Sequence, residues 1–211
     1  MKQTQNLRSL AEIADIRTGF TFREKVEESP DNGNAHIAQI KDARSEWERT
    51  NGNDLLISQL PLIHWEGKDK AFVEPGTVLL PARGAKGSGY FRASCLMADE
   101  PSSLPVVVSS QFLIITPKKE VLPEFLCWSL NQPAIQYHLT EGAGSQGSNI
   151  VMLNTKLAGE LQLEIPSLKT QHKILHLNRL REQEQQLTQA LLKNRDIMLQ
   201  GMFQQLLKET E

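Results

Sequence analysis

The last forty or so residues of this chain constrain its fold more than any other segment. From Ser167 to Lys208 there is no proline, and Gly201 is the one glycine. The segment is rich in Leu, Gln, Glu, Lys and Arg, which favour helices, and Ser167 or Thr170 can cap its start. A helix of roughly 40 residues is about 60 Å long. A domain of this size cannot bury such a helix along its whole length, so we expect it to pack against partners.

The apolar residues of this helix recur in alternating steps of three and four. This spacing predicts a coiled coil with the seam Leu177, Leu180, Glu184, Leu187, Leu191, Asn194, Met198 and Gly201. The polar seam residues Glu184 and Asn194 can set register or orientation at some cost in stability. A second apolar set widens the stripe towards the C-terminus and indicates more than one partner helix there: Leu192, Met202, Leu206 and Leu207. The alternative is a helix that folds back on its own domain.

Residues 1–165 differ in composition and predict a globular domain, with residues 166–211 as the helical part. Nearly all Gly and Pro residues lie in the first part, between short apolar or β-branched runs. These runs predict strands at His36–Ile40, Val78–Leu80, Phe112–Thr116 and Leu161–Ile165. Pro at a first helical position predicts helices at Pro123–Asn131 and Pro133–Thr140. We therefore expect an α/β or α+β fold with a mixed sheet and short helices, without being able to derive the strand order.

The bulk composition excludes several classes of protein. The formal net charge of -2 argues against a protein that coats DNA or an anionic membrane through its overall charge. The two cysteines, Cys95 and Cys127, form no CxxC motif, which favours a reducing compartment. The start has no apolar stretch typical of a signal peptide, and no run of about 18 apolar residues predicts a membrane span. We expect a cytoplasmic protein without a membrane partner.

Motifs of common enzymes are missing from the sequence. It contains no Walker A loop, no G-x-S-x-G elbow and no H-E-x-x-H pair. The segment Gly142–Gly147 fits G-x-G-x-x-G, but helical sequence precedes it and the extended segment Asn149–Leu153 follows, the reverse of a dinucleotide site. His172 and His176 are four residues apart and have no third ligand nearby. We expect no metal and no cofactor in this chain.

Six segments, taken in order, carry a resemblance to a known family. They are Leu10–Phe22, His36–Asp42, Gly76–Gly84, Leu122–Leu130, Gly142–Gly147 and Ile165–Ile174. Together they resemble the specificity subunit of type I restriction-modification systems, which usually carries two target-recognition domains, each followed by a long helix. Ser167 departs from the family's usual second proline. The chain also matches only one such unit, which puts the stoichiometry in doubt.

The resemblance implies a chain that directs other subunits to a bipartite site on double-stranded DNA. Those partners are modification subunits, which methylate adenine at N6, and a restriction subunit. The chain lacks the Asn/Asp-Pro-Pro-Tyr/Phe motif of adenine methyltransferases, so S-adenosylmethionine is expected on the modification subunit. A second copy of the chain would supply the missing half through antiparallel helices. The residues expected at these helix contacts are Leu177, Leu180, Leu187, Leu191, Asn194, Met198 and Met202.

The best candidate for DNA contact is the stretch from Gly76 to Met97, which has no acidic residue. It contains Arg83, Lys86, Ser88 and Arg92 among glycines that let the backbone approach a ligand. The alternative is a hairpin tip with ordinary surface charges. Further candidates are Arg17, Arg23, Lys41, Arg44, Gln146 and Ser148.

Other features near these candidates favour simpler interpretations. The alternation of Phe20 and Phe22 favours core positions, and Lys68–Lys70 is interpreted as an exposed turn. Two rival functions stay open: a coiled-coil interaction module without DNA specificity, and an enzyme with an unrecognised active site.

Overall fold

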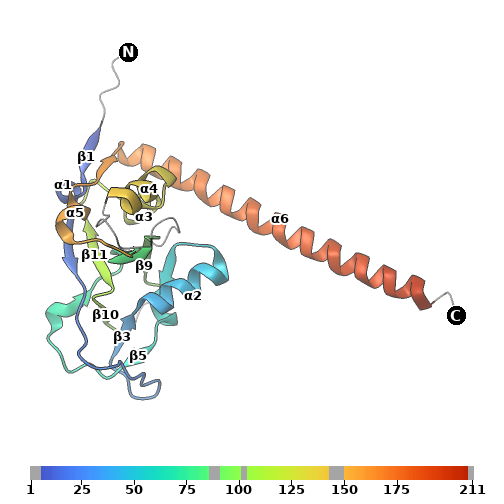
Figure 1. The fold of residues 1–211 in the computed structure, drawn as a ribbon, viewed down its shortest axis with the longest axis horizontal. Coiled ribbons are helices and arrows are strands. Elements are labelled where there is room, and N and C mark those ends of the chain that lie inside the picture. Colours follow the sequence, from blue (N-terminus) through green and yellow to red (C-terminus); the bar gives the residue numbers. More distant parts are fainter. Residues whose placement is uncertain (1–5, 86–90, 101–103, 143–149, 209–211) are drawn as a thin grey trace, which may run out of the picture. The chain divides into compact units, whose positions relative to one another are not determined.

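The computed structural model describes residues 6–85, 91–100, 104–142 and 150–208 (Figure 1). The chain divides into two compact units, residues 1–171 and residues 172–211. The first combines sheets with short helices, and one long helix reaches Lys208, so the mixed α/β fold with a long C-terminal helix is confirmed. None of the helices in these described ranges is both long and apolar enough to cross a membrane.

The larger sheet of the first unit has five strands in the order β2-β11-β7-β9-β4. Neighbours are antiparallel except β9 and β4, which run parallel. The strands are β2 (Ala14–Thr18), β11 (Phe112–Pro117), β7 (Val78–Pro81), β9 (Ser94–Met97) and β4 (Asp54–Leu56). The predicted strands Val78–Leu80 and Phe112–Thr116 are thus confirmed as β7 and β11, and they lie side by side.

A second sheet has four strands in the order β5-β3-β10-β6. Here β3 and β10 are parallel, and the other pairs are antiparallel. The strands are β5 (Leu62–Ile63), β3 (Ala35–Ala38), β10 (Val106–Val108) and β6 (Phe72–Val73). Two further pairs join β1 (Leu7–Ser9) to β13 (Gln162–Glu164) and β8 (Arg83–Ala85) to β12 (Ile150–Met152).

Strand β10 shows how the second sheet is buried on both faces. Successive side chains of a strand point to opposite faces. Val106 and Val108 join a cluster with Phe112 and Ile114 of the five-stranded sheet. Val107 belongs to a different cluster on the other face. An uninterrupted apolar run is what a strand buried on both faces requires.

Helix α2 (Ile40–Thr50) corrects the predicted strand His36–Ile40. The strand ends at Ala38, and the Asp42 carboxylate accepts the Gln39 amide at 2.9 Å, which caps the helix start. Ile40, Ala43 and Trp47, spaced for one helix face, pack into the core between the sheets.

The other short helices are α1 (Leu10–Ile13), α3 (Pro123–Leu130), α4 (Pro133–Gly142) and α5 (Thr155–Gly159). α3 packs against β7, β9 and β11, beside α4 in Figure 1. Short 3₁₀ turns span Ile57–Gln59 (η1) and Asp69–Ala71 (η2). The two helices predicted from their initial prolines are confirmed as α3 and α4.

The long helix α6 spans Leu168–Lys208, and the Ser167 hydroxyl accepts the Thr170 amide at 3.4 Å at its start. Gln171, at the end of its first turn, is fully buried in the first unit. Its Oε1 accepts the Leu122 amide, and its Nε2 donates to the carbonyls of Glu120 and Pro166, each at 2.9 Å.

In the second unit, many apolar side chains of α6 are exposed. They are Leu177, Leu180, Leu187, Leu191, Leu192, Ile197, Met198, Leu199, Met202, Phe203, Leu206 and Leu207. Leu192, Leu199 and Leu206 are spaced seven residues apart, beside the seam expected from sequence. Burying an apolar side chain of this size in an interface would contribute roughly 1.5–3 kcal/mol.

Candidate functional site

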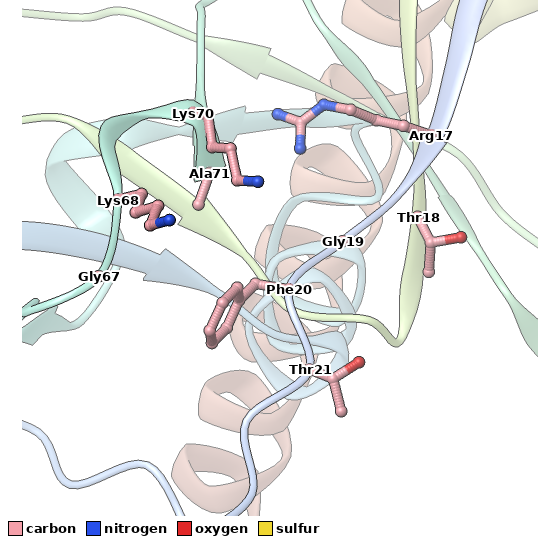
Figure 2. A pocket seen from close by; sticks show the side chains of 9 residues that line it. All are labelled: Arg17, Thr18, Gly19, Phe20, Thr21, Gly67, Lys68, Lys70 and Ala71. Atoms are coloured by element: carbon pink, nitrogen blue, oxygen red, sulfur yellow. The ribbon is translucent and has the colours of Figure 1, made fainter.

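The candidate site is a pocket of about 660 Å³ at the edges of the two sheets (Figure 2). It is lined by residues 17–21, which include the end of β2, and by residues 67, 68, 70 and 71 around η2. β2 is an edge strand of the five-stranded sheet, and β6, which follows η2, is an edge strand of the four-stranded sheet.

Backbone hydrogen bonds hold the first wall of the pocket against both sheets. The Gly19 amide donates to the Phe112 carbonyl of the larger sheet at 3.1 Å. The Phe20 amide donates to the Val108 carbonyl at the end of β10, and the Phe20 carbonyl accepts the Ser110 amide, both at 2.7 Å. This segment therefore passes from one sheet to the other within two residues, which fixes the Phe20 backbone.

Two glycines make the close approaches that shape the walls. A Cβ atom at Gly19 would collide with the backbone carbonyl of Ser109, and a Cβ atom at Gly67 would collide with the Trp65 ring. Neither neighbour is a flexible side-chain end that moves at small cost. Both positions therefore require glycine for reasons of space.

The pocket concentrates positive charge. Arg17, Lys68 and Lys70 line it, and none of its nine lining residues, all within the described ranges, is acidic. The Arg17 guanidinium donates to the Phe72 carbonyl at 3.0 Å, so this bond connects β2 to the edge strand β6. Figure 2 shows the three cationic side chains extending into the region beside Phe20, while Thr18 and Thr21 point away. Such a group of cations attracts anions, above all phosphate.

A cluster of aromatic side chains packs around Phe20, one of the residues that line the pocket. Phe20 contacts Phe22 and Trp65 edge to face, with ring centroids 5.0 and 4.9 Å apart. Phe22 and Trp65 pack against the apolar cluster around Val107. The expected core position suits Phe22, which is half-buried, but Phe20 remains 42% exposed at the pocket. The bridge between Phe20 and Ser109 accounts for this difference, because it holds Phe20 just beyond the end of β10.

The other predicted contact residues lie elsewhere, and the pocket does not include them. Arg83 is exposed on β8, opposite Met152 of β12. Arg92 is half-buried: its Nε donates to the Asn53 side chain at 2.9 Å, and its Nη2 donates to the carbonyls of Asn51 and Gly52 at 2.7 and 2.9 Å. Its guanidinium also lies 5.7 Å from the Trp47 ring centroid.

The remaining candidates differ in their surroundings. Arg23 and Arg44 are exposed, the latter on α2. Lys41 forms an ion pair with Glu28, and the hydrogen bond to that carboxylate raises the pKa of the Lys41 amine. Lys86, Ser88, Gln146 and Ser148 lie outside the described residues.

Lys68 and Lys70 were missed by the sequence analysis as members of a site. They lie in the exposed turn expected there, but more than fifty residues of sequence separate Lys70 from Arg17. The pair of lysines was the one sequence signal for this part of the pocket. Because such pairs are common on protein surfaces, it did not indicate a site.

Two further features concern metal ligands and thiols in the part of the chain that is described. There, no three His, Cys, Asp or Glu side chains are grouped closely enough to hold a metal ion. Cys95 and Cys127 are free and buried, and burial raises the pKa of both thiols. A buried, protonated thiol is a poor nucleophile.

A comparison with protein-family models matches residues 3–194 to the type I restriction modification DNA specificity domain. The match covers the described pocket and continues into α6. A comparison with curated proteins found no match.

Solved structures share the fold at low sequence identity. The HsdS subunit from Thermoanaerobacter tengcongensis matches with a TM-score of 0.59 and 16% identity, over 90% of this chain and 41% of that chain. A chain from a study of complex assembly and conformational transition of the type I R-M system matches with a TM-score of 0.59 and 17% identity, over 90% of this chain and 42% of that one. The type IIG restriction endonuclease BpuSI matches with a TM-score of 0.52 and 11% identity, over 79% of this chain and 25% of that chain. This chain thus spans about two fifths of the length of the first two.

Proposed function

The chain belongs to the family of type I restriction-modification DNA specificity domains, and we propose that it recognises DNA for a restriction-modification complex without performing the chemistry itself. The family match carries this proposal, because it covers residues 3–194 and so includes both the globular unit and most of the long helix. The adenine-N6 methyltransferase activity, the S-adenosylmethionine and the restriction activity would belong to partner subunits.

Local positive charge supports DNA contact by a chain whose net charge is -2. Arg17, Lys68 and Lys70 in the pocket provide such charge, and so does the exposed Arg83 within its acid-free stretch. Cations of this kind hold phosphates, while base edges are read by other groups in the grooves. Arg92 donates to three groups of residues 51–53, and Lys41 is paired with a carboxylate. Arg17 lines the pocket and donates to one backbone carbonyl, and Arg83 is exposed, so we favour these two among the predicted residues as DNA contacts.

We further propose that α6 pairs with a second copy of the chain and also docks modification subunits. The exposed apolar side chains from Leu177 to Leu207 support a helical partner. Two copies would supply two recognition units, and a two-fold pair with antiparallel helices would read a palindromic, interrupted site. The breadth of the apolar surface near Leu199 and Phe203 suits contact with more than one helix.

The decisive experiment compares adenine methylation across the genome in cells with and without this gene. We expect one bipartite motif to lose its methylation on deletion and to regain it when the gene is restored. Restoration with Arg83→Ala combined with Lys86→Ala should recover less methylation, although the complex still assembles. If deletion leaves every methylated motif unchanged, the chain is not the specificity subunit of an active system.

The rival proposal, a coiled-coil module without a DNA role, is favoured by the same exposed face of α6. A mobility-shift assay with the modification subunits present separates the two, because only a recognition subunit changes the DNA sequence that the complex binds. Testing the chain alone would be a weaker assay, since its net charge of -2 predicts weak unaided binding to duplex DNA.

The dimer is tested by placing carboxylates on the seam. Leu187→Asp with Leu191→Asp should convert a dimer into monomers in sedimentation velocity, because paired helices would bury four charges. Gln185→Asp with Gln189→Asp has the same spacing on the opposite side of the helix and should leave the dimer intact. A dimer that survives the leucine substitutions would refute pairing through this seam.

A further inference from the structure

We propose that the pocket between β2 and η2 binds one unstacked nucleotide of DNA, with its phosphate on Arg17, Lys68 and Lys70 and its base against Phe20. The inference rests on the proposed DNA-recognition function and assigns a ligand to this pocket. It concerns a different part of the chain from the stretch around Arg83.

The positive charge of the pocket indicates that one part of the ligand is an anion. Three cations and no carboxylate line it, in a chain whose acidic residues outnumber its basic ones. The bond from Arg17 to the Phe72 carbonyl fixes the guanidinium beside the pocket and uses one of its five N–H donors. A guanidinium with further donors and two mobile ammonium groups suits the several oxygens of a phosphate.

The exposed ring of Phe20 indicates that the other part of the ligand has a flat, apolar face. Its side chain is 42% exposed, although two aromatic neighbours contact it, so a large apolar surface remains available at the pocket. Cations beside an exposed aromatic ring are the combination with which proteins hold single-stranded nucleic acid, where each base stacks on a ring. A phosphate site alone does not need the ring.

The size and rigidity of the pocket favour one nucleotide over a long segment of duplex. Its volume of about 660 Å³ lies within the range of small-ligand sites, roughly 300–1,000 Å³. The close approaches at Gly19 and Gly67 pack both walls against neighbouring residues, with no room for a Cβ atom at either position. A base within a duplex has its faces covered by its neighbours, so a base that stacks on Phe20 must first leave the helix.

The test measures binding of a fluorescently labelled oligothymidine of about a dozen nucleotides to the full chain at low salt, by anisotropy. Phe20→Ala should weaken binding by roughly 5- to 150-fold, the range that stacking of one base supplies, and Phe20→Tyr should retain it. Tyr137→Ala, which removes an exposed aromatic ring from α4, should have no effect. Intrinsic tryptophan fluorescence checks that each variant is folded.

The phosphate contacts are tested by the salt dependence of the same binding. Lys68→Ala with Lys70→Ala should reduce the slope of log affinity against log salt by about 0.7 to 1.4, which corresponds to one or two phosphate contacts on a single strand. Lys119→Ala with Lys156→Ala removes two exposed lysines outside the pocket and should leave the slope unchanged.

Three results would overturn the inference. They are a wild-type chain that binds no oligothymidine, a Phe20→Ala variant that binds as well as wild type, and a loss with Phe20→Tyr equal to that with Phe20→Ala. If the lysine pair matters and Phe20 does not, the pocket holds phosphate alone. The methylation experiment is independent of these results, so the DNA-recognition function can stand where the nucleotide pocket fails.

Discussion

Replacing Gln171 with methionine tests the hydrogen bonds that fix the start of α6. The side chain is fully buried, and its amide satisfies one backbone N–H and two carbonyls of the first unit. Gln171→Met keeps the length and approximate volume of the side chain but removes all three bonds.

The expected loss of stability follows from the number of bonds. A buried hydrogen bond contributes about 1 kcal/mol net, so three bonds correspond to about 3 kcal/mol. Glu120 is exposed, and Leu122 and Pro166 are half-buried, so water can reach the three backbone groups and no further penalty for unpaired groups applies. For a unit of this size, about 3 kcal/mol lowers the melting temperature by roughly 6–12 °C.

Urea denaturation followed by tryptophan fluorescence measures this loss. All three tryptophans, Trp47, Trp65 and Trp128, lie in residues 1–171, so the signal reports the unit to which Gln171 belongs. Gln162→Met, at an exposed position of β13, is the matched control and should change the unfolding free energy by less than about 0.5 kcal/mol. If Gln171→Met costs under about 1 kcal/mol, the three bonds do not stabilise this unit as argued.

Three other changes have outcomes that follow from local geometry. Gly19→Ala should destabilise the first unit by about 1–3 kcal/mol in the same urea assay, because the added Cβ atom meets a backbone carbonyl. Gly201→Ala has open space around it and should increase the helicity measured by circular dichroism. Arg92→Ala should cost about 2 kcal/mol in urea denaturation through lost bonds to residues 51–53, and an unchanged midpoint would contradict this. At pH 8, Cys95 and Cys127 should react with a thiol reagent far more slowly than in urea, because burial raises both thiol pKa values and blocks access; equal rates would show that they are accessible.

Elements with strong local signals could be predicted from the sequence. The proline-free run predicted α6 to within a residue at each end, and the initial prolines predicted α3 and α4. The apolar runs of β7 and β11 were long enough to be predicted as strands. In each case the determining residues are neighbours in sequence.

Features that depend on distant residues could not be predicted. Strands of two or three residues, such as β5 and β6, are too short to show alternation, and their order depends on pairing across the sheet. Arg17 and Lys70 come together in the pocket because two sheet edges meet there, so the sequence around one residue does not predict its proximity to the other. Gln171 was included in a family-like segment, but its burial became evident only from its bonds to residues 120, 122 and 166.

The attachment of α6 through Gln171 also bears on how such chains diverge. All three partners of its amide are backbone groups, at Leu122, Glu120 and Pro166. Backbone groups are the same whatever side chains a lineage acquires, so mutation can rewrite the surface of the globular unit while this attachment persists. A recombination event that exchanges the part of the chain before Gln171 for a homologous one with the same backbone course would retain the hydrogen-bond set. The globular unit can then change without a matching change at the start of α6.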